Sequence, residues 1–148
     1  MTDTVDSLLR EHAVRHSDKP AIIDPDGRIS YRDLDRGTRA LAASFVEAGI
    51  GKGSRVGLIM ANGVEWARSA VALRRSGAVL VPLSTRLSPR ELTAQLRTAS
   101  VQHLIAVEQF RGRRYLDTLQ IAGLPALRSI RTPAQVDVLT ADPDAVSI

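Results

Sequence analysis

The chain has 148 residues, 44% of them hydrophobic and 24% charged, which is the ordinary composition of one globular domain with its own core. It contains no cysteine, which excludes disulfide bonds and cysteine-ligated zinc, and no apolar run approaches the ~20 residues that a membrane-spanning helix needs. The formal net charge of +4 does not predict a nucleic-acid partner, because the densest basic cluster is only three arginines in an expected solvated loop, Arg111, Arg113 and Arg114.

A helix and a β-hairpin are predicted at the start of the chain. Apolar residues recur at helical spacing from residue 5 to residue 13, which is typical of an amphipathic helix. A short strand over residues 19–24, the turn signal Pro25-Asp26-Gly27 and an extended run over residues 28–31 then predict a hairpin. The acidic N-terminus lacks the basic and apolar segments of a signal peptide, so a cytoplasmic location is expected.

Two helix starts follow, each marked by a capping residue and an acidic residue three positions later. Ser30 with Asp33, and Asn62 with Glu65, predict helices in which the first side chain accepts a hydrogen bond from a free backbone N–H. Both helices are expected to end at a glycine, because glycine adopts a left-handed backbone conformation without a steric penalty. These glycines are Gly49 and Gly77.

Residues 55–107 form the most regular part of the sequence. Apolar strands are predicted over residues 55–60, 78–81 and 103–107, with amphipathic helices between them. The second of these helices has a strong start at Ser88, with proline at the first helical position and an acidic residue three positions after the serine. Strands that are apolar throughout and alternate with helices indicate a parallel sheet covered on both faces. We therefore predict an α/β fold with a parallel βαβαβ core over residues 55–107.

The signals weaken after residue 107. A helix is predicted over residues 115–122 and a short strand over residues 129–131. A loop over residues 132–144 and an apolar strand over residues 145–148 are expected to complete the chain.

No motif in the sequence assigns a catalytic, cofactor-binding or metal-binding residue. The glycine-rich stretch over residues 49–54 lacks the spacing of a dinucleotide fingerprint, and it precedes a strand rather than a helix. His12 and His16 lie four positions apart but have no evident third ligand, so no metal site is expected there. His103 begins a predicted strand and is expected to be a packed or capping residue.

The topology nevertheless indicates where a ligand would bind. Open α/β sheets bind ligands at the carboxyl ends of their parallel strands. Three stretches would line that edge here: residues 60–62, 83–85 and 108–109.

Four stretches of the chain follow patterns of a known enzyme family. Residues 28–34 are similar to a segment T/S-Y-x-E/D-L, and residues 51–58 are similar to the glycine-containing entry into the next strand. Residues 75–83 closely match K/R-x-G-A-x-x-V-P-L/I, and residues 89–92 stand where the family has Glu-Leu opening a helix. In these motifs the chain resembles the N-terminal part of the AMP-forming acyl-CoA synthetases and ligases, the adenylate-forming enzymes.

The resemblance implies a parent enzyme that activates a carboxylic acid, such as a fatty acid, with ATP and magnesium to an acyl-adenylate and transfers the acyl group to CoA. In the family, a phosphate-binding T-S-G-T-T-G-x-P-K-G segment follows the equivalent of residues 142–148, and the other ATP, magnesium and acyl segments and a catalytic lysine lie further on. Residues 1–148 are therefore expected to be a partial N-terminal domain that binds no cofactor and is inactive alone.

A non-catalytic α/β interaction module is the alternative interpretation. In either case, an exposed sheet edge is expected to favour self-association.

Overall fold

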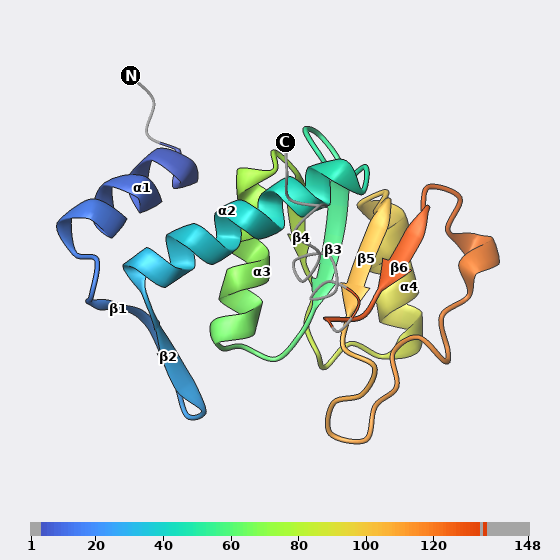
Figure 1. Cartoon of the computed structure of the whole chain (residues 1–148). Coiled ribbons are helices and arrows are strands. Elements are labelled where there is room, and N and C mark those ends of the chain that lie inside the picture. Colours follow the sequence, from blue (N-terminus) through green and yellow to red (C-terminus); the bar gives the residue numbers. More distant parts are fainter. Residues whose placement is uncertain (1–3, 134, 136–148) are drawn as a thin grey trace.

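A computed structural model describes residues 4–133 and 135, which form a four-stranded parallel sheet with helices on both faces and a separate two-stranded hairpin (Figure 1). The described elements, in chain order, are α1 (Val5–Arg15), β1 (Pro20–Asp24), β2 (Gly27–Ser30), α2 (Tyr31–Glu47), β3 (Arg55–Ile59), α3 (Val64–Arg75), β4 (Val79–Pro82), α4 (Pro89–Thr98), β5 (His103–Ala106), the 3-10 turn η1 (Ile121–Gly123) and β6 (Ser129–Arg131).

The sheet has the strand order β4-β3-β5-β6, and every neighbouring pair is parallel. In the central strand, Val56 is opposite Leu80 of β4 on one side and His103 of β5 on the other. The parallel βαβαβ core predicted over residues 55–107 is therefore confirmed, and so is the short strand over residues 129–131.

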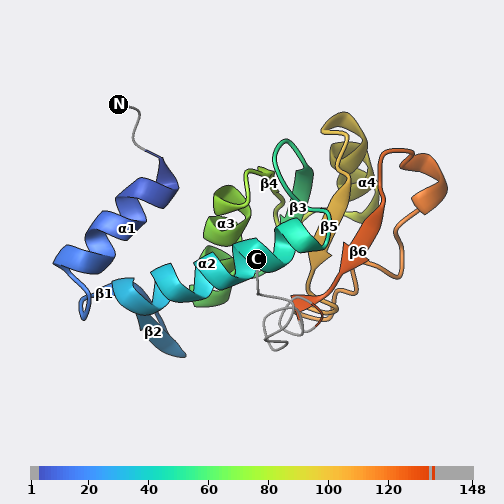
Figure 2. The same ribbon diagram turned by 45° about the horizontal axis from the view of Figure 1, so that its top comes forward.

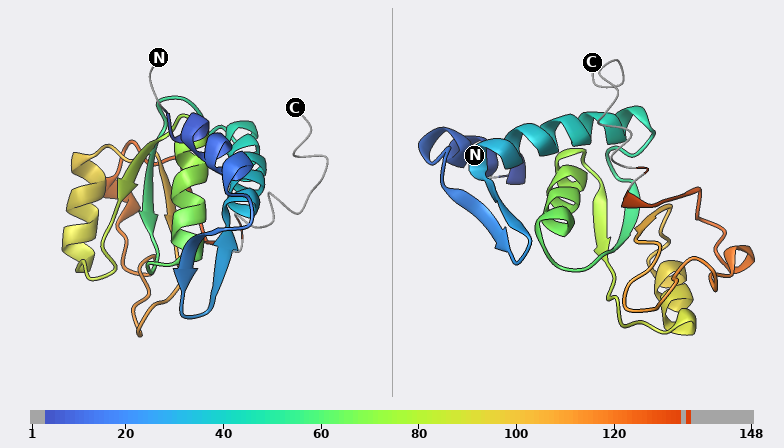
Figure 3. Two further views of the ribbon diagram at one scale, coloured as in Figure 1. Left: turned by 90° about the vertical axis from the view of Figure 1, so that its left-hand side faces the viewer. Right: turned by 60° about the horizontal axis from the view of Figure 1, so that its bottom comes forward.

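Buried side chains cover both faces of this sheet. The face that includes Val56, Leu58 and Ile105 packs against α2 and α3, whereas the face that includes Ile59 and Leu104 packs against α4. Figure 3 (left panel) shows the same layers edge-on, with α4 on one side of the sheet and α2 and α3 on the other. Because both faces are covered, the central strands carry apolar residues at successive positions instead of alternating ones.

The N-terminal helix and hairpin form as the sequence predicts. Strands β1 and β2 are antiparallel, and α2 then runs from the hairpin towards the sheet (Figure 2). Ser30 caps α2 by accepting a hydrogen bond from the backbone N–H of Asp33 at 3.1 Å, and Ser88 caps α4 in the same way. The helix-ending glycines Gly49 and Gly77 have φ angles of 89° and 88°, which confirms both left-handed ends.

The predicted cap of α3 by Asn62 is wrong. The N-cap position belongs to Gly63, which has no side chain to accept a hydrogen bond. Instead, the carboxylate of Asp24, at the end of β1, accepts a hydrogen bond from the backbone N–H of Val64 at 2.8 Å. Asp24 of the hairpin thus caps α3, a role that the local sequence signal predicts for Asn62.

The predicted helix over residues 115–122 is also wrong. This segment contains only turns and the start of η1. Tyr115 is buried, and its hydroxyl donates a hydrogen bond to the carbonyl oxygen of Thr85 at 2.8 Å. This bond attaches the segment to the loop after β4, and no helix forms there. Apart from residues 132, 133 and 135, the loop and strand predicted after residue 131 lie outside the described residues. Within the described part of the chain, no helix has the length and apolar content required to cross a membrane.

Candidate functional site

The strongest candidate site follows from the directions in which the chain leaves two neighbouring strands. β3 leads into α3 on one face of the sheet, and β4, next to it, leads into α4 on the opposite face. Where adjacent parallel strands send their connections to opposite faces, a crevice opens at their carboxyl ends, and α/β proteins use such crevices to bind ligands.

A cleft of about 670 Å³ lies at this crevice. Its size is within the range of sites that hold small molecules and cofactors. The lining residues come from the loop after β3, the start of α3, the loop after β4 and the turn after β5. They are Met60, Ala61, Asn62, Trp66, Pro82, Leu83, Ser84, Thr85, Arg86, Phe110 and Arg111.

Two of the three stretches predicted to line the edge do so. Residues 60–62 and 83–85 line the cleft, but residues 108–109 do not, and the next two residues, Phe110 and Arg111, take their place. The reason is a tight turn after β5, in which Arg111 and the following glycine have positive φ angles of 51° and 81°. This turn brings the Phe110 and Arg111 side chains to the cleft, and the sequence carries no strong signal for it.

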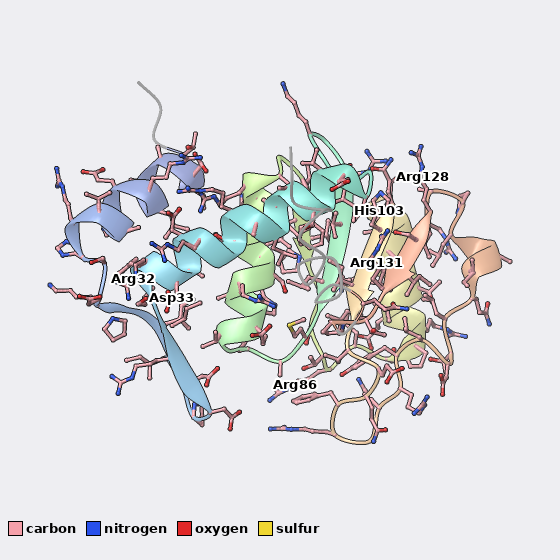
Figure 4. The ribbon with its side chains drawn as sticks, viewed as in Figure 1. Arg32, Asp33, Arg86, His103, Arg128 and Arg131 are labelled. Atoms are coloured by element: carbon pink, nitrogen blue, oxygen red, sulfur yellow. The ribbon has the colours of Figure 1, made fainter. Side chains whose placement is uncertain are left out.

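The cleft is lined by cationic and neutral groups. Arg86 and Arg111 are its charged residues, and no acidic side chain is among the described residues that line it. The Arg111 guanidinium lies 5.2 Å from the centre of the Phe110 ring, an arrangement that holds a cation over an aromatic face. Arg86 extends from the loop after β4 at the lower edge of the sheet in Figure 4. This lining suits a ligand that bears a carboxylate or phosphate beside an apolar or aromatic part.

The loops around the cleft are tied to each other. Arg113 donates a hydrogen bond to the carbonyl oxygen of Leu87 at 2.6 Å, and Tyr115 donates to that of Thr85 at 2.8 Å. Arg114 instead pairs with Asp117 at 2.6 Å. The arginine cluster that the sequence suggests to be a solvated loop is therefore exposed, but Arg113 also joins the loop after β5 to the loop after β4.

His103 lies away from the cleft, at the beginning of β5 (Figure 4). It is buried, and its Nδ1 is 2.6 Å from the Ser129 hydroxyl of β6, so the predicted packed role is confirmed. Burial lowers the pKa of its imidazole, and the positive charges of Arg131 and Arg128 lower it further. The contact between His103 and Ser129 joins β5 to β6.

The described residues offer no metal site and no proton-transfer pair at the cleft. His12 and His16 have ring centres 5.8 Å apart, and no group of three or more His, Cys, Asp or Glu side chains in the described part of the chain is placed to hold a metal ion. The cleft lining contains no His, Asp, Glu or Lys within that part, so its polar groups are suited to binding and not to general acid–base catalysis.

Fold and cleft together define an α/β domain with a ligand site at the carboxyl ends of parallel strands. The family model of the AMP-binding enzymes matches residues 9–147, so the chain belongs to that family. Its relatives include a naringenin synthase of Pestalotiopsis fici, which is 36% identical over 138 residues, and a long-chain-fatty-acid–CoA ligase of Salmonella typhimurium, which is 33% identical over 105 residues.

These relatives are much longer proteins. The matches cover 92% and 70% of this chain but only 5% and 18% of the two relatives, respectively. Among solved structures, the N-terminal domain of FACL13 from Mycobacterium tuberculosis superposes with a TM-score of 0.85 at 23% identity, over 97% of this chain and 37% of that one. This similarity shows that the chain has the fold of the N-terminal part of an adenylate-forming enzyme.

Proposed function

We propose that the chain is the N-terminal part of an AMP-forming acyl-CoA ligase, which activates a carboxylic acid such as a fatty acid and transfers the acyl group to CoA. The observation that carries the proposal is the family match over residues 9–147, by a chain that spans 18% of a long-chain-fatty-acid–CoA ligase. On this proposal, residues 1–148 are a partial N-terminal domain built around the core of residues 55–107, and the parent protein supplies the sites for ATP, magnesium and CoA.

The cleft contributes binding to this reaction, not bond formation. Its two arginines favour the carboxylate and phosphate groups that all the substrates of such a ligase carry. Adenylation also requires the ATP phosphates to be held in a fixed geometry by backbone N–H groups, a cation and magnesium. The described residues contain no glycine-rich loop between a strand and a helix that could form such a cradle, and this supports the proposal that the chain alone is inactive.

The test of this proposal has two arms. In the first, the purified chain with magnesium, ATP and a panel of short to long fatty acids is assayed for exchange of labelled pyrophosphate into ATP. We expect no exchange above a heat-killed control, and exchange that follows the protein peak through chromatography would contradict the inactivity. In the second, the codons after Ile148 are sequenced: a T-S-G-T-T-G-like segment supports a ligase, and unrelated sequence supports an interaction module.

A second candidate function is self-association through the edge of the sheet. β4 is an edge strand within the described sheet, and its Val79 is 51% exposed. Beside it, an uncharged groove of about 340 Å³ lies between β4 and α4. Its lining residues are Val81, Ala94, Gln95, Thr98 and Ala99. An unpaired strand edge with an apolar border is a template for pairing with another chain.

A lysine at the edge should weaken such an association, because charge on an edge strand opposes strand pairing. We expect the wild-type chain to show concentration-dependent mass by light scattering, and Val79→Lys to shift it towards the monomer. Val14→Lys is the matched control, since Val14 is 84% exposed but lies on α1, outside the sheet. A wild-type chain that is monomeric at all concentrations argues against association through this edge.

A further inference from the structure

The start of α3 is held by a residue from the hairpin, 40 residues earlier in the chain. The Oδ2 atom of Asp24 accepts a hydrogen bond from the backbone N–H of Val64, the first residue of the helix, at 2.8 Å. Both hairpin strands lie against α3 (Figure 3), which brings the carboxylate to the helix end. A negative charge at this position is favoured by the free N–H groups and the dipole of the helix.

The same carboxylate also closes the hairpin turn. The Oδ1 atom of Asp24 accepts hydrogen bonds from the backbone N–H groups of Asp26 at 2.8 Å and Gly27 at 2.9 Å. The hydrogen bond from Val64, then that from Asp26 and, to a smaller extent, that from Gly27 hold the pKa of Asp24 below its usual range, against the opposing effect of burial. One side chain therefore connects the turn of the hairpin to the start of α3.

Gly63 makes this close approach possible. A Cβ atom at position 63 would lie 2.9 Å from the Oδ2 atom of Asp24, closer than real Cβ contacts allow. The φ angle of Gly63 is +154°, a conformation that residues with a side chain rarely adopt. The glycine at the N-cap position is thus matched to a carboxylate that arrives from outside the helix.

The loop that Asp24 holds is one wall of the cleft. Ala61 and Asn62 immediately precede Gly63, Trp66 follows it in the first turn of α3, and all three line the cleft. Because Asp24 supplies the cap, the Asn62 amide is not used as one, and it makes no hydrogen bond to the described part of the chain. We infer that Asp24 is a positioning residue: from the hairpin, it fixes the Ala61–Trp66 wall of the cleft and leaves the Asn62 side chain to face a ligand.

The inference rests on the proposed function in one respect only, that the cleft is where a ligand binds. The coupling between Asp24 and the cleft wall is measurable without any substrate. If the ligase proposal proves wrong, the coupling between Asp24 and the cleft wall can still hold. If the coupling is not observed, the ligase proposal still stands.

Trp66 is the only tryptophan of the chain, so its fluorescence reports on the cleft wall. Protonation of Asp24 removes the charge that holds Val64. We therefore expect the Val64 amide resonance, the Asn62 side-chain NH₂ resonances and the Trp66 emission to change together on acid titration, with one midpoint below the usual aspartate range. Resonances of the sheet centre, such as that of Ile105, serve as the control for global unfolding.

Two variants of the same turn complete the test. Asp24→Asn keeps an oxygen acceptor but does not titrate, so the shared transition should be lost while the fold is retained. The Asp26 side chain forms no hydrogen bond within the described residues. Asp26→Asn should therefore leave the transition unchanged. The inference is overturned if Trp66 and Asn62 do not follow the Val64 titration, or if Asp24→Ala lowers the melting temperature while the Trp66 emission stays as in the wild type. Either result would reduce Asp24 to an ordinary helix cap.

Discussion

At the residue scale, two glycines allow the same substitution to be tested with opposite expected signs. Gly77 ends α3 at a φ angle of +88°, and a Cβ atom there would lie 3.0 Å from the Cα atom of Lys52. We expect Gly77→Ala to lower the free energy of unfolding by about 1–2 kcal/mol, because an L-residue is strained in this conformation. Urea denaturation measures this change.

Gly37, within α2, provides the matched comparison. A Cβ atom there would have no heavy atom within 4 Å, and the residue is in an α-helix. Gly37→Ala should raise the free energy of unfolding by about 0.5–1 kcal/mol, since alanine is a better helix former and restricts the unfolded chain. Changes of the same sign at both positions would contradict the assignment of Gly77 to a left-handed helix end.

At the element scale, a buried arginine joins three helices. The Arg75 side chain of α3 is only 2% exposed. Its Nε lies 2.9 Å from Asp6 of α1, and its Nη1 lies 2.7 Å from Asp35 and 3.2 Å from Thr38, both in α2. Because these contacts pair a buried positive charge with two carboxylates, they fix how α1 and α2 pack on α3.

Replacing this arginine tests the junction. We expect Arg75→Met to cost about 3 kcal/mol of unfolding free energy, because it removes the buried partner of the Asp35 carboxylate and leaves it only Arg39, whose side chain is 52% exposed. Arg10→Met is the control: Arg10 pairs with the same Asp6, but its side chain is 53% exposed, and such pairs contribute at most about 1 kcal/mol. Equal losses in the two variants, measured by urea denaturation, would show that the Arg75 cluster has no special role.

The sequence predicts the elements that depend on local signals and misses the features that depend on distant partners. Ser30 and Ser88 cap helices through residues three positions away, so their signals are local and both are confirmed. The predicted Asn62 cap is wrong because Asp24, 40 positions before Val64 in the sequence, accepts the hydrogen bond at the helix start. The helix expected after Tyr115 fails because that side chain is bound to a carbonyl group 30 residues earlier.

The candidate site divides in the same way. Its location follows from strand order and the alternation of helices, which the sequence patterns indicate, and residues 60–62 and 83–85 are found there. The positive charge of the cleft cannot be predicted in this way, because the turn that brings Arg111 to the cleft has no hydrophobic periodicity in the sequence. The ion cluster around Arg75 is likewise invisible in the sequence, since its partners lie 37 to 69 positions from Arg75: Asp6 is 69 positions away, Asp35 is 40 and Thr38 is 37.

At the scale of the whole molecule, three titratable groups act in the same direction on stability. The pKa of Asp6 is raised by burial, but the hydrogen bond and charge of Arg75, together with Arg10, outweigh this and hold it below the usual range. The pKa of Asp24 is lowered chiefly by the Val64 N–H, and that of His103 is lowered by burial and by two arginines. A group with a lower pKa in the folded chain binds fewer protons there than in the unfolded chain, so stability rises with pH.

The two kinds of group should lose their contributions in separate pH windows. As the pH falls through the ordinary histidine value of about 6.5 towards the lowered pKa of His103, the unfolded chain gains a proton that the folded chain resists, and stability declines. Below the ordinary carboxylate values of about 4, Asp6 and Asp24 repeat the effect, because protonation removes the charges that bind Arg75 and Val64. Urea denaturation across the acid to neutral range should therefore show two declines. His103→Gln should remove the upper decline and leave the lower one, because glutamine does not titrate. An upper decline that persists in this variant would mean that another group titrates in that window, and that the junction of His103 with Ser129 is not what protonation breaks.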